Sequence, residues 1–443
     1  MRNAARLGWS ALMMLALVAQ GGFGQERPET DPAEAWIPQL GSDDFRLREA
    51  ASDALGKLGI KALPAMKAAL KTTDRPEVSR RLEALLERLE AVRLRDPIRI
   101  TWKPERRPIK EIIQTVAETA GCKVRFQETP EKLLLSFHWV ETPLLQVLDQ
   151  IGEASGLSVQ PLDDDFNRLI VYRNDWTFPM PYYTGPFRFT PHVITMSRQL
   201  QIGGLARNAP NRQVNESMNL NLMIASEPKM PFAAIGNAVL LKAVDDRGQS
   251  LIEPPPDAAP AGANLVPEAE ALMPSYRTHG LNFSVNLGRP HRQAERIKLL
   301  KGHIQTCLLV DTQPILSIDN LPEAKGKKFD ARHYTVEVGA INATVAPTTI
   351  EMTVRRKGGT EEDAGWLQTL YSRLAFHDTD GTRLQFAGTQ DARNTPNSTT
   401  VLIQLQRSGT RSVRPAKPMR LVFVEWITKQ RVVEFELKDI PLP

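Results

Sequence analysis

Between residues 98 and 173, the spacing of hydrophobic and polar positions changes repeatedly from strand to helix. Ile98 and Ile100 alternate with polar neighbours, as in a half-buried strand. The apolar residues that follow recur at i, i+3, i+4 and i+7, which is the spacing of one helix face; they are Ile109, Ile112, Ile113, Val116, Ala117 and Ala120. We expect Pro108 to open this helix, and Gly121 to end it because glycine readily adopts positive φ.

The same pattern then recurs. Thr142 is a good capping residue and Pro143 suits the first helical position, so a second helix is predicted from there to Gly156. Strands are predicted around the helices, at residues 124–126, 133–137, 157–159 and 169–172. Residues 97–174 therefore form a predicted βαββαββ unit. Such a small open sheet offers an unpaired edge, and we expect a partner strand to add at residues 169–172.

Two helix–glycine–strand joints, at residues 119–124 and 154–159, accompany the strand at 133–137 and the helix start Thr142-Pro143-Leu144. Together they resemble the short N-terminal domain of secretins and TonB-dependent receptors. The resemblance implies a domain that recognises partners in the bacterial periplasm and that has no invariant catalytic residue. It covers residues 97–174 only, so it implies an architecture and a compartment, and the partner itself is not carried over.

Residues 33–95 have helical spacing throughout. Asp43 or Asp44 is expected to cap a first helix that Gly59 ends, a second follows from Leu63, and Pro76 starts a third. The segment 44–59, with an arginine at position 48, resembles a HEAT-type repeat. Solenoids need about three repeats for stability, and only one to one and a half are present. We therefore expect a helical packing module and no concave binding surface.

Residues 1–24 have the pattern of a secretory signal peptide. Arg2 and Arg6 precede an apolar core at residues 7–18, which is too short to cross a bilayer. Small residues follow, and Gly22-Phe23-Gly24 is the favoured cleavage site, with Ala19-Gln20-Gly21 as the alternative. We expect an exported, periplasmic or cell-envelope protein with no transmembrane segment in the mature chain.

From residue 184 onward the apolar positions alternate, and turn residues separate the runs, which is typical of β-sandwiches. Two Ig-like sandwiches are predicted, at residues 184–312 and 313–443, with a long loop at 253–275. An internal repeat supports the pair, because the pattern Asp-x-x-Gly-x-x-Leu follows an apolar strand twice, at residues 245–251 and 378–384. The predicted fold class is multidomain α+β.

Composition narrows the function only slightly. The formal charge of the 443 residues is +5, and two of the positive charges belong to the leader, so no nucleic-acid partner is expected. Basic clusters at 325–328 and 407–420 are either solvated loops or a site for an anionic partner. The aromatic connector 174–189 either packs its rings between domains or forms a stacking platform for carbohydrate or peptide.

Cys122 and Cys307 lie in different predicted domains, and buried free thiols are favoured over an interdomain disulfide. The sequence has no HExxH, GxSxG, Walker or GxGxxG pattern. The histidines are scattered; they are His138, His192, His279, His291, His303, His333 and His377.

Residues 378–381 resemble the start of a calcium loop, but the twelfth position is Thr389 and not glutamate, so a turn is predicted. Residues 163–165 form another predicted turn. No catalytic, cofactor or metal residues are expected.

Two functional hypotheses follow. The first is a non-catalytic envelope protein, an adaptor or structural component, that binds another envelope protein or a cell-wall polymer through the central unit and the sandwiches. The alternative is a secreted hydrolase whose carboxylate pair, Glu361 or Asp363 with Asp378, converges only in the folded chain.

Overall fold

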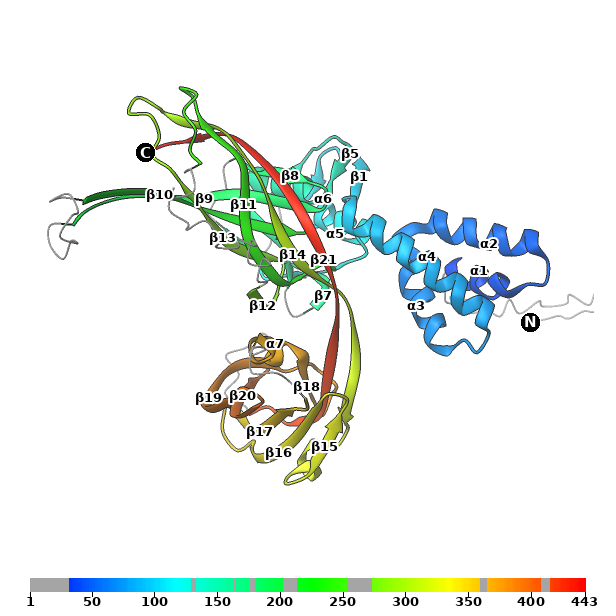
Figure 1. Cartoon of the computed structure of the whole chain (residues 1–443). Coiled ribbons are helices and arrows are strands. Elements are labelled where there is room, and N and C mark those ends of the chain that lie inside the picture. The colour runs from blue at the N-terminus through cyan, green and yellow to red at the C-terminus, as the bar shows by residue number, and fades with distance from the viewer. Residues whose placement is uncertain are drawn as a thin grey trace, which may run out of the picture. The chain divides into compact units, whose positions relative to one another are not determined.

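The structure is a computed structural model that describes residues 32–128, 133–162, 165–174, 180–201, 213–252, 273–358, 365–407 and 415–443. Within them the chain is a mixed α+β protein with seven α-helices and several β-sheets, which confirms the coarse fold class (Figure 1). It divides into two compact units, with the boundary between Leu89 and Glu90. The predicted signal peptide, residues 1–24, lies outside the described residues.

The first unit is helical. Its elements are α1 (Pro32–Trp36), the 3-10 helices η1 (Ile37–Gly41) and η2 (Gly59–Ala62), α2 (Phe45–Leu58), α3 (Leu63–Thr72) and most of α4 (Pro76–Arg95). As predicted, Asp44 caps α2, because its carboxylate accepts a hydrogen bond of 2.8 Å from the Arg46 amide. The Arg48 guanidinium donates to the carbonyl oxygens of Ser42 and Asp43, which holds the turn before α2.

The second unit begins with the end of α4 and continues through residues 97–174, where a βαββαββ unit was predicted and the observed order has one more strand before each helix. The elements there are β1 (Arg99–Trp102), β2 (Arg107–Pro108), α5 (Ile109–Thr119), β3 (Lys123–Phe126), β4 (Leu134–Leu135), β5 (Trp139–Pro143), α6 (Leu144–Ser155), β6 (Leu157–Leu162) and β7 (Asp165–Arg173). Both predicted helices are present, and their apolar faces are buried in one shared core. Gly121 and Gly156 have the expected positive φ.

The start of α6 differs from the prediction. Pro143 occupies the N-cap position, no side chain caps the helix, and the first helical residue is Leu144. The Leu144 amide instead donates to the Ile98 carbonyl oxygen at 2.8 Å. A contact between distant segments therefore satisfies the amide that Thr142 was expected to cap. The strand predicted at 133–137 is also shorter, and β5 follows it as a separate strand.

The expected edge strand at residues 169–172 is wrong. These residues belong to β7, the middle strand of the sheet β3-β7-β6, which pairs in parallel with β3 and antiparallel with β6. The Leu169 and Val171 side chains are fully buried. The apolar character that marked this strand comes from its central position, so its edges are not available to a partner.

The rest of the second unit is a set of long strands. A four-stranded sheet has the order β13-β10-β9-β8 and comprises β8 (Tyr182–Thr184), β9 (Phe187–Gln201), β10 (Gln213–Ser226) and β13 (Gly280–Leu287). A five-stranded sheet has the order β12-β11-β14-β21-β18 and comprises β11 (Phe232–Asp245), β12 (Met273–Thr278), β14 (Arg296–Ile318), β18 (Leu374–Asp378) and β21 (Pro418–Pro441). Residue 273 already begins β12, although the long loop was predicted to reach residue 275.

A third sheet has the order β15-β16-β17-β20-β19. Its strands are β15 (Lys328–Ala331), β16 (Tyr334–Asn342), β17 (Thr348–Arg356), β19 (Gln385–Thr395) and β20 (Ser398–Gln406), with η3 (Leu321–Ala324) and α7 (Gly365–Arg373) beside them. Two apolar cores result. The first lies between the four-stranded sheet and one end of the five-stranded sheet, and the second lies between the other end and the third sheet.

The strands β14 and β21 belong to both cores. The first part of β14 pairs with β11, and its last residues, 311–318, pair with the start of β21 in the second core. In the opposite direction, β21 begins beside β18 and ends beside the start of β14, where Ile440 faces Ile297. Strand pairing also repeats, because β8-β9-β10-β13 has the same order as β15-β16-β17-β20. The last strand of each half, β14 or β21, therefore also contributes to the core of the other half.

The two Asp-x-x-Gly-x-x-Leu segments form equivalent turns. The Gly248 amide donates to the Asp245 carbonyl, and the Gly381 amide donates to the Asp378 carbonyl. Both glycines have positive φ, 85° and 77°, and the leucine that follows each turn is buried. The turns predicted from the internal repeat are therefore confirmed.

Candidate functional site

The candidate residues of the hydrolase hypothesis do not form a described site. Glu361 and Asp363 lie outside the described residues. Asp378 is buried, and its carboxylate accepts hydrogen bonds from the Thr379 amide at 2.7 Å and from Arg407 at 2.6 Å. These contacts hold the turn after β18, in agreement with the turn interpretation of residues 378–381.

The histidines and cysteines stay dispersed in the fold. Within the described ranges, no three His, Cys, Asp or Glu side chains gather closely enough to bind a metal ion. Cys122 and Cys307 are both buried free thiols, so the disulfide alternative is not supported. None of the helices in the described part is both long and apolar enough to cross a membrane.

The basic clusters are paired in part. Lys328 lies 3.6 Å from Glu337, Arg407 pairs with Asp378, and Arg420 pairs with Asp319 at 2.9 Å. Residues 408–414 of the second cluster lie outside the described residues. In the parts that are described, Lys328 pairs across the strands β15 and β16, Arg420 pairs with the residue that follows β14, and Arg407 contacts the turn after β18.

The aromatic connector packs inward where the structure describes it. Phe187 and Phe189 are fully buried in the first core. The Tyr183 hydroxyl donates to the Asp149 carboxylate at 2.6 Å, and Arg188 pairs with the same carboxylate. The turn predicted at 163–165 and the connector residues 175–179 lie at least partly outside the described residues. Packing between segments is therefore favoured over a stacking platform for the described rings.

A buried carboxylate that the sequence patterns did not reveal joins the segment of β1–β7 to the first core. Glu227, between β10 and β11, accepts hydrogen bonds from the Ile98 amide at 3.1 and 2.9 Å. Burial raises the pKa of Glu227 to about 8, and the Ile98 amide and Arg99 oppose that rise. Burial likewise raises the pKa of Asp149, against the charge of Arg188 and the hydrogen bond from Tyr183. Glu227 accepts from the Ile98 amide, and Asp149 contacts Tyr183 and Arg188. Both carboxylates therefore hold segments of this chain together.

The outer parts of β9 and β10 form a two-stranded arm, which we define as residues 193–201 and 213–217 (Figure 1). β8 pairs only with residues 187–189 of β9, and β13 pairs only with residues 218–225 of β10. Among the described residues, the outer edges of both arm strands therefore have no strand partner. The arm also exposes apolar side chains, because Val193, Met196 and Leu200 are 53%, 44% and 49% exposed.

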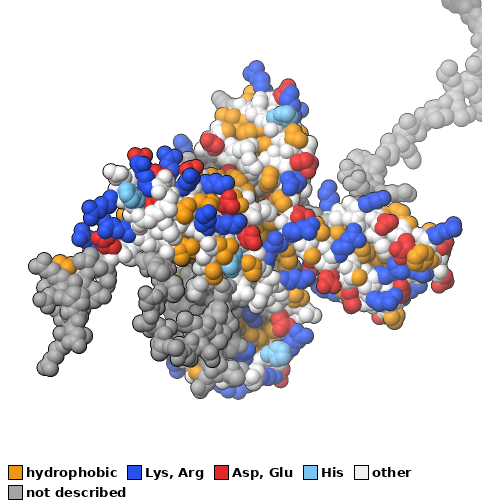
Figure 2. Space-filling model, turned by 45° about the horizontal axis from the view of Figure 1, so that its top comes forward, with side chains coloured by type: hydrophobic (Ala, Val, Ile, Leu, Met, Phe, Trp, Pro, Cys, Tyr) orange, Lys and Arg blue, Asp and Glu red, His pale blue; other side chains and the backbone are white. Residues whose placement is uncertain are grey.

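One face of the arm borders a groove of about 300 Å³. Met196 faces Met218 and Arg198 faces Glu216 across the two strands, and the turn after β13 adds Arg289 to the lining. Glu216 pairs with both arginines, at 3.2 Å from Arg198 and 2.6 Å from Arg289. Exposed Arg292 and His291 add to the lining, so positive side chains exceed negative ones. Figure 2 shows Lys and Arg side chains gathered on the side to which the arm projects in Figure 1.

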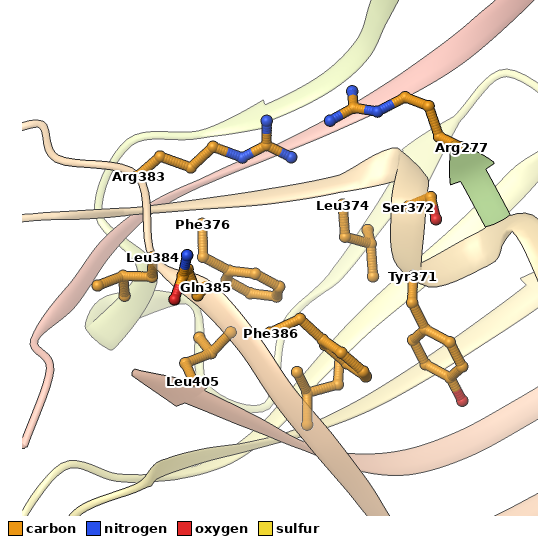
Figure 3. Close-up of a pocket in the computed structure, with 11 residues that line it drawn as sticks. Arg277, Tyr371, Ser372, Leu374, Phe376, Arg383, Leu384, Gln385, Phe386 and Leu405 are labelled. Carbon is orange, nitrogen blue, oxygen red and sulfur yellow. The ribbon is translucent and has the colours of Figure 1, made fainter. Parts of the chain in front are cut away.

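A second cavity, of about 410 Å³, lies beside α7, β18 and β19. Its floor is apolar, with Leu374, Phe376 and Leu405 buried below it. Figure 3 shows the guanidinium groups of Arg277 and Arg383 on the same side of this cavity, each pointing toward the other. We call this cavity the two-arginine pocket.

No family model, curated protein or solved structure matches the chain. The resemblances to the short N-terminal domain of secretins and to a HEAT-type repeat therefore stay predictions.

Proposed function

We propose that the protein is an exported, non-catalytic adaptor that binds an extended, acidic segment of another cell-envelope protein. The observation that carries this proposal is the arm, which combines exposed apolar side chains with strand edges that have no strand partner among the described residues. An added strand pairs through main-chain hydrogen bonds, while alternate side chains supply specificity. Natural proteins usually protect long edge strands against such pairing.

The groove supports the choice of an acidic partner. Three arginines line it, and the carboxylate of Glu216 is shared by two of them. A surface with excess positive charge attracts segments with Asp and Glu side chains and speeds their encounter. The arm thus offers the backbone pairing, and the groove offers the charge recognition.

The predicted signal peptide and the resemblance to the short N-terminal domain of secretins both favour the envelope as the compartment. With the edge at residues 169–172 excluded, the proposed partner contact moves from the central segment to the arm. The function predicted from the sequence, partner binding, is therefore retained. The proposed binding surface is now the arm in place of the strand at residues 169–172.

The test is a peptide-display selection on the purified mature chain, followed by fluorescence anisotropy with the enriched peptides. We expect extended, acid-rich peptides whose affinity falls about tenfold or more in Met196→Glu and in Arg292→Glu. Leu241→Glu on β11, where the leucine is 54% exposed, and Arg393→Glu on β19 are matched controls outside the arm and groove, and they should bind like wild type.

Several results would count against the adaptor. One is enrichment of peptides whose binding is the same in the arm variants and the controls. Another is binding to purified cell-wall polymer, but to no peptide, with loss in the same arm variants; that would assign the groove to the polymer. Hydrolysis of peptidoglycan, glycan or peptide that is lost in Glu361→Gln or Asp363→Asn would favour the hydrolase.

A further inference from the structure

The four-stranded sheet has an uncharged polar surface on the side away from the first core. Successive side chains of a strand point to opposite faces, and the even-numbered residues of β10 from Met218 to Ile224 lie in that core. Their odd-numbered neighbours therefore share the other face with the residues beside them on β9 and β13 (Figure 1). We call this surface the polar face; it comprises Thr195, Ser197, Gln199, Ser217, Asn219, Asn221, Asn282, Ser284 and Asn286.

The proposed adaptor role does not use the amides of this face. A peptide added to the arm pairs with the main chain at a strand edge, and the groove side chains Met196, Arg198 and Glu216 occupy the alternate positions of the same strands. Ser197 and Ser217 also border the groove. The amides of β10 and β13 are therefore the part of the polar face that is distinct from it.

The composition of the polar face is unusual for a strand surface. Asparagine is depleted in strands, yet asparagines stand at positions 219 and 221 of β10 and at 282 and 286 of β13. Protein surfaces are typically about 25–35% charged. At the alternate positions 193–199 of β9, 217–223 of β10 and 282–286 of β13, however, no residue is charged. Residues that local strand preference disfavours indicate a function other than folding.

The amides of this face are held in place by bonds across the strands. The Asn219 amide nitrogen donates to the Asn286 amide oxygen at 2.8 Å, and the Ser284 hydroxyl donates to the Asn221 amide oxygen. An amide has two donor hydrogens and two acceptor lone pairs, so one such bond occupies only part of its capacity. Side chains that are already oriented lose less conformational freedom when a ligand binds.

The array is regular in two directions. Neighbouring strands lie about 5 Å apart, and side chains on one face recur about every 7 Å along a strand. Asn282, Ser284 and Asn286 are exposed along β13, and Asn219 and Asn221 are half-buried beside them on β10. Such spacing suits a polymer that is itself extended and carries polar groups at regular intervals.

We propose that the polar face binds an extended, uncharged polysaccharide, with the amides of Asn219, Asn221 and Asn286 bonded to its hydroxyl groups. A sugar hydroxyl both donates and accepts hydrogen bonds, and an amide does the same without a charge. Val193, which is 53% exposed and lies opposite Asn221, offers an apolar contact to the C–H face of a sugar ring. A nucleic acid would need positive side chains, which this face lacks at the positions named above.

Isothermal titration calorimetry of the full mature chain tests the proposal with cellohexaose, chitohexaose and maltohexaose. The first two are extended β-1,4-linked chains without charge, and they differ in the acetamido group of chitohexaose. Maltohexaose has the same sugar as cellohexaose, but its α-1,4 linkages make the chain coil. We expect saturable binding of at least one extended oligosaccharide, with maltohexaose about tenfold or more weaker.

The variants remove one amide at a time. Asn219→Val and Asn286→Val should each weaken binding of the preferred oligosaccharide about tenfold, which is 1.4 kcal/mol. Both should melt at or above the wild-type temperature, because valine is favoured in strands, so a loss of binding cannot be attributed to unfolding. Gln390→Val replaces an exposed amide on β19, outside the polar face, and is the matched control that should bind like wild type.

A second comparison separates this site from the proposed peptide site. Met196→Glu should keep the wild-type affinity for the oligosaccharide, and acidic peptides selected on the arm should bind Asn286→Val as they bind wild type. Peptide binding can therefore fail while oligosaccharide binding succeeds, and the reverse.

The proposal is overturned if neither extended oligosaccharide binds, or if maltohexaose binds as tightly as cellohexaose and chitohexaose. It is also overturned if both valine variants keep the wild-type affinity, or if Gln390→Val loses as much affinity as they do. Loss of acidic-peptide binding in Asn219→Val and Asn286→Val would assign the polar face to the peptide and overturn it as a polysaccharide site.

Discussion

Glu227 is the side chain whose environment departs most from what its sequence position indicates. It stands between two strands, where a solvated carboxylate is ordinary, yet it is 1% exposed and bound to the Ile98 amide. Taking a carboxylate out of water favours its protonated form. The pKa of about 8 follows from this burial, and it couples the stability of the second unit to pH.

We expect this group to make the protein less stable as the pH rises from 4.5 to 8. The folded state holds the Glu227 proton in that window and the unfolded state does not, because the ordinary pKa is 4.5. Each pH unit there lowers the free energy of unfolding by about 1.4 kcal/mol. Glu227→Gln keeps an oxygen for the Ile98 amide and should melt several degrees above wild type at pH 8.5, but close to it at pH 4.5.

Melting curves measured at several pH values between 4.5 and 8.5 give the comparison. Glu323→Gln, at an exposed position in η3, is the control and should follow the wild-type curve. Parallel curves for Glu227→Gln and wild type at every pH would contradict the shifted pKa.

Gly248 and Gly381 show how a single backbone angle supports an element. Both have φ near 80°, and a Cβ at either position would meet nothing within 4 Å. The cost of a side chain is therefore conformational and not steric. Gly248→Val or Gly381→Val should lower the free energy of unfolding by about 1–2 kcal/mol. Asn at either position should cost less, since asparagine tolerates this region, and denaturant titration measures the order. Equal stability of Val, Asn and wild type would refute the turn argument.

At the scale of elements, the strands of the five-stranded sheet approach each other unusually closely at Gly302. A Cβ there would lie 2.5 Å from the Val239 carbonyl oxygen in β11 and 2.7 Å from the Phe435 ring in β21. The backbone oxygen cannot move without disturbing the ladder, so overpacking is the relevant cost.

Gly302→Ala should therefore destabilise the second unit by about 1–3 kcal/mol. Gly280→Ala in β13 is the matched control, because its Cβ would meet only the Met223 sulfur, at 3.9 Å. The control should be neutral or slightly stabilising, since alanine loses less conformational freedom on folding. Chemical denaturation of both variants measures this difference in stability. Similar midpoints would contradict the prediction, because they would show that β11 and β14 can move apart at Gly302 without loss of stability.

At the scale of the whole molecule, the sharing of β14 and β21 sets the cooperativity of folding. Neither core is complete without a strand that also belongs to the other. Local unfolding of one core therefore removes the edge against which the other is paired. The two halves should open together, in contrast to the independent opening expected of sandwiches joined only by a linker.

Val401→Ala removes buried volume from β20 in the second core, and Leu220→Ala does so from β10 in the first. Each should raise hydrogen exchange in peptides of both cores, because the loss of buried methyl groups lowers their common opening free energy. Mass spectrometry of exchanged peptides from β10 and β20 measures this. Faster exchange confined to the core that carries the substitution would show that the cores open separately.

Local features of this protein were predictable from the sequence. The apolar stripes placed α5 and α6, Asp44 and Gly59 marked the ends of α2, and the Asp-x-x-Gly-x-x-Leu pattern identified two equal turns. These features depend on residues within a few positions of one another. Helix periodicity, capping and turn chemistry act over that distance, so the sequence is sufficient for them.

Only the tertiary structure decided which strands became neighbours. β7 lies in the middle of its sheet, and β14 and β21 extend through both cores. The Ile98 amide donates a hydrogen bond to Glu227, which is distant in the sequence. The same long-range packing brought Arg277 and Arg383 to one pocket and, among the described residues, left the outer edges of the arm strands without a strand partner. Strand order is set by backbone hydrogen bonds and burial between distant segments, and an alternating pattern shows that a strand has a buried face without indicating which strand lies beside it.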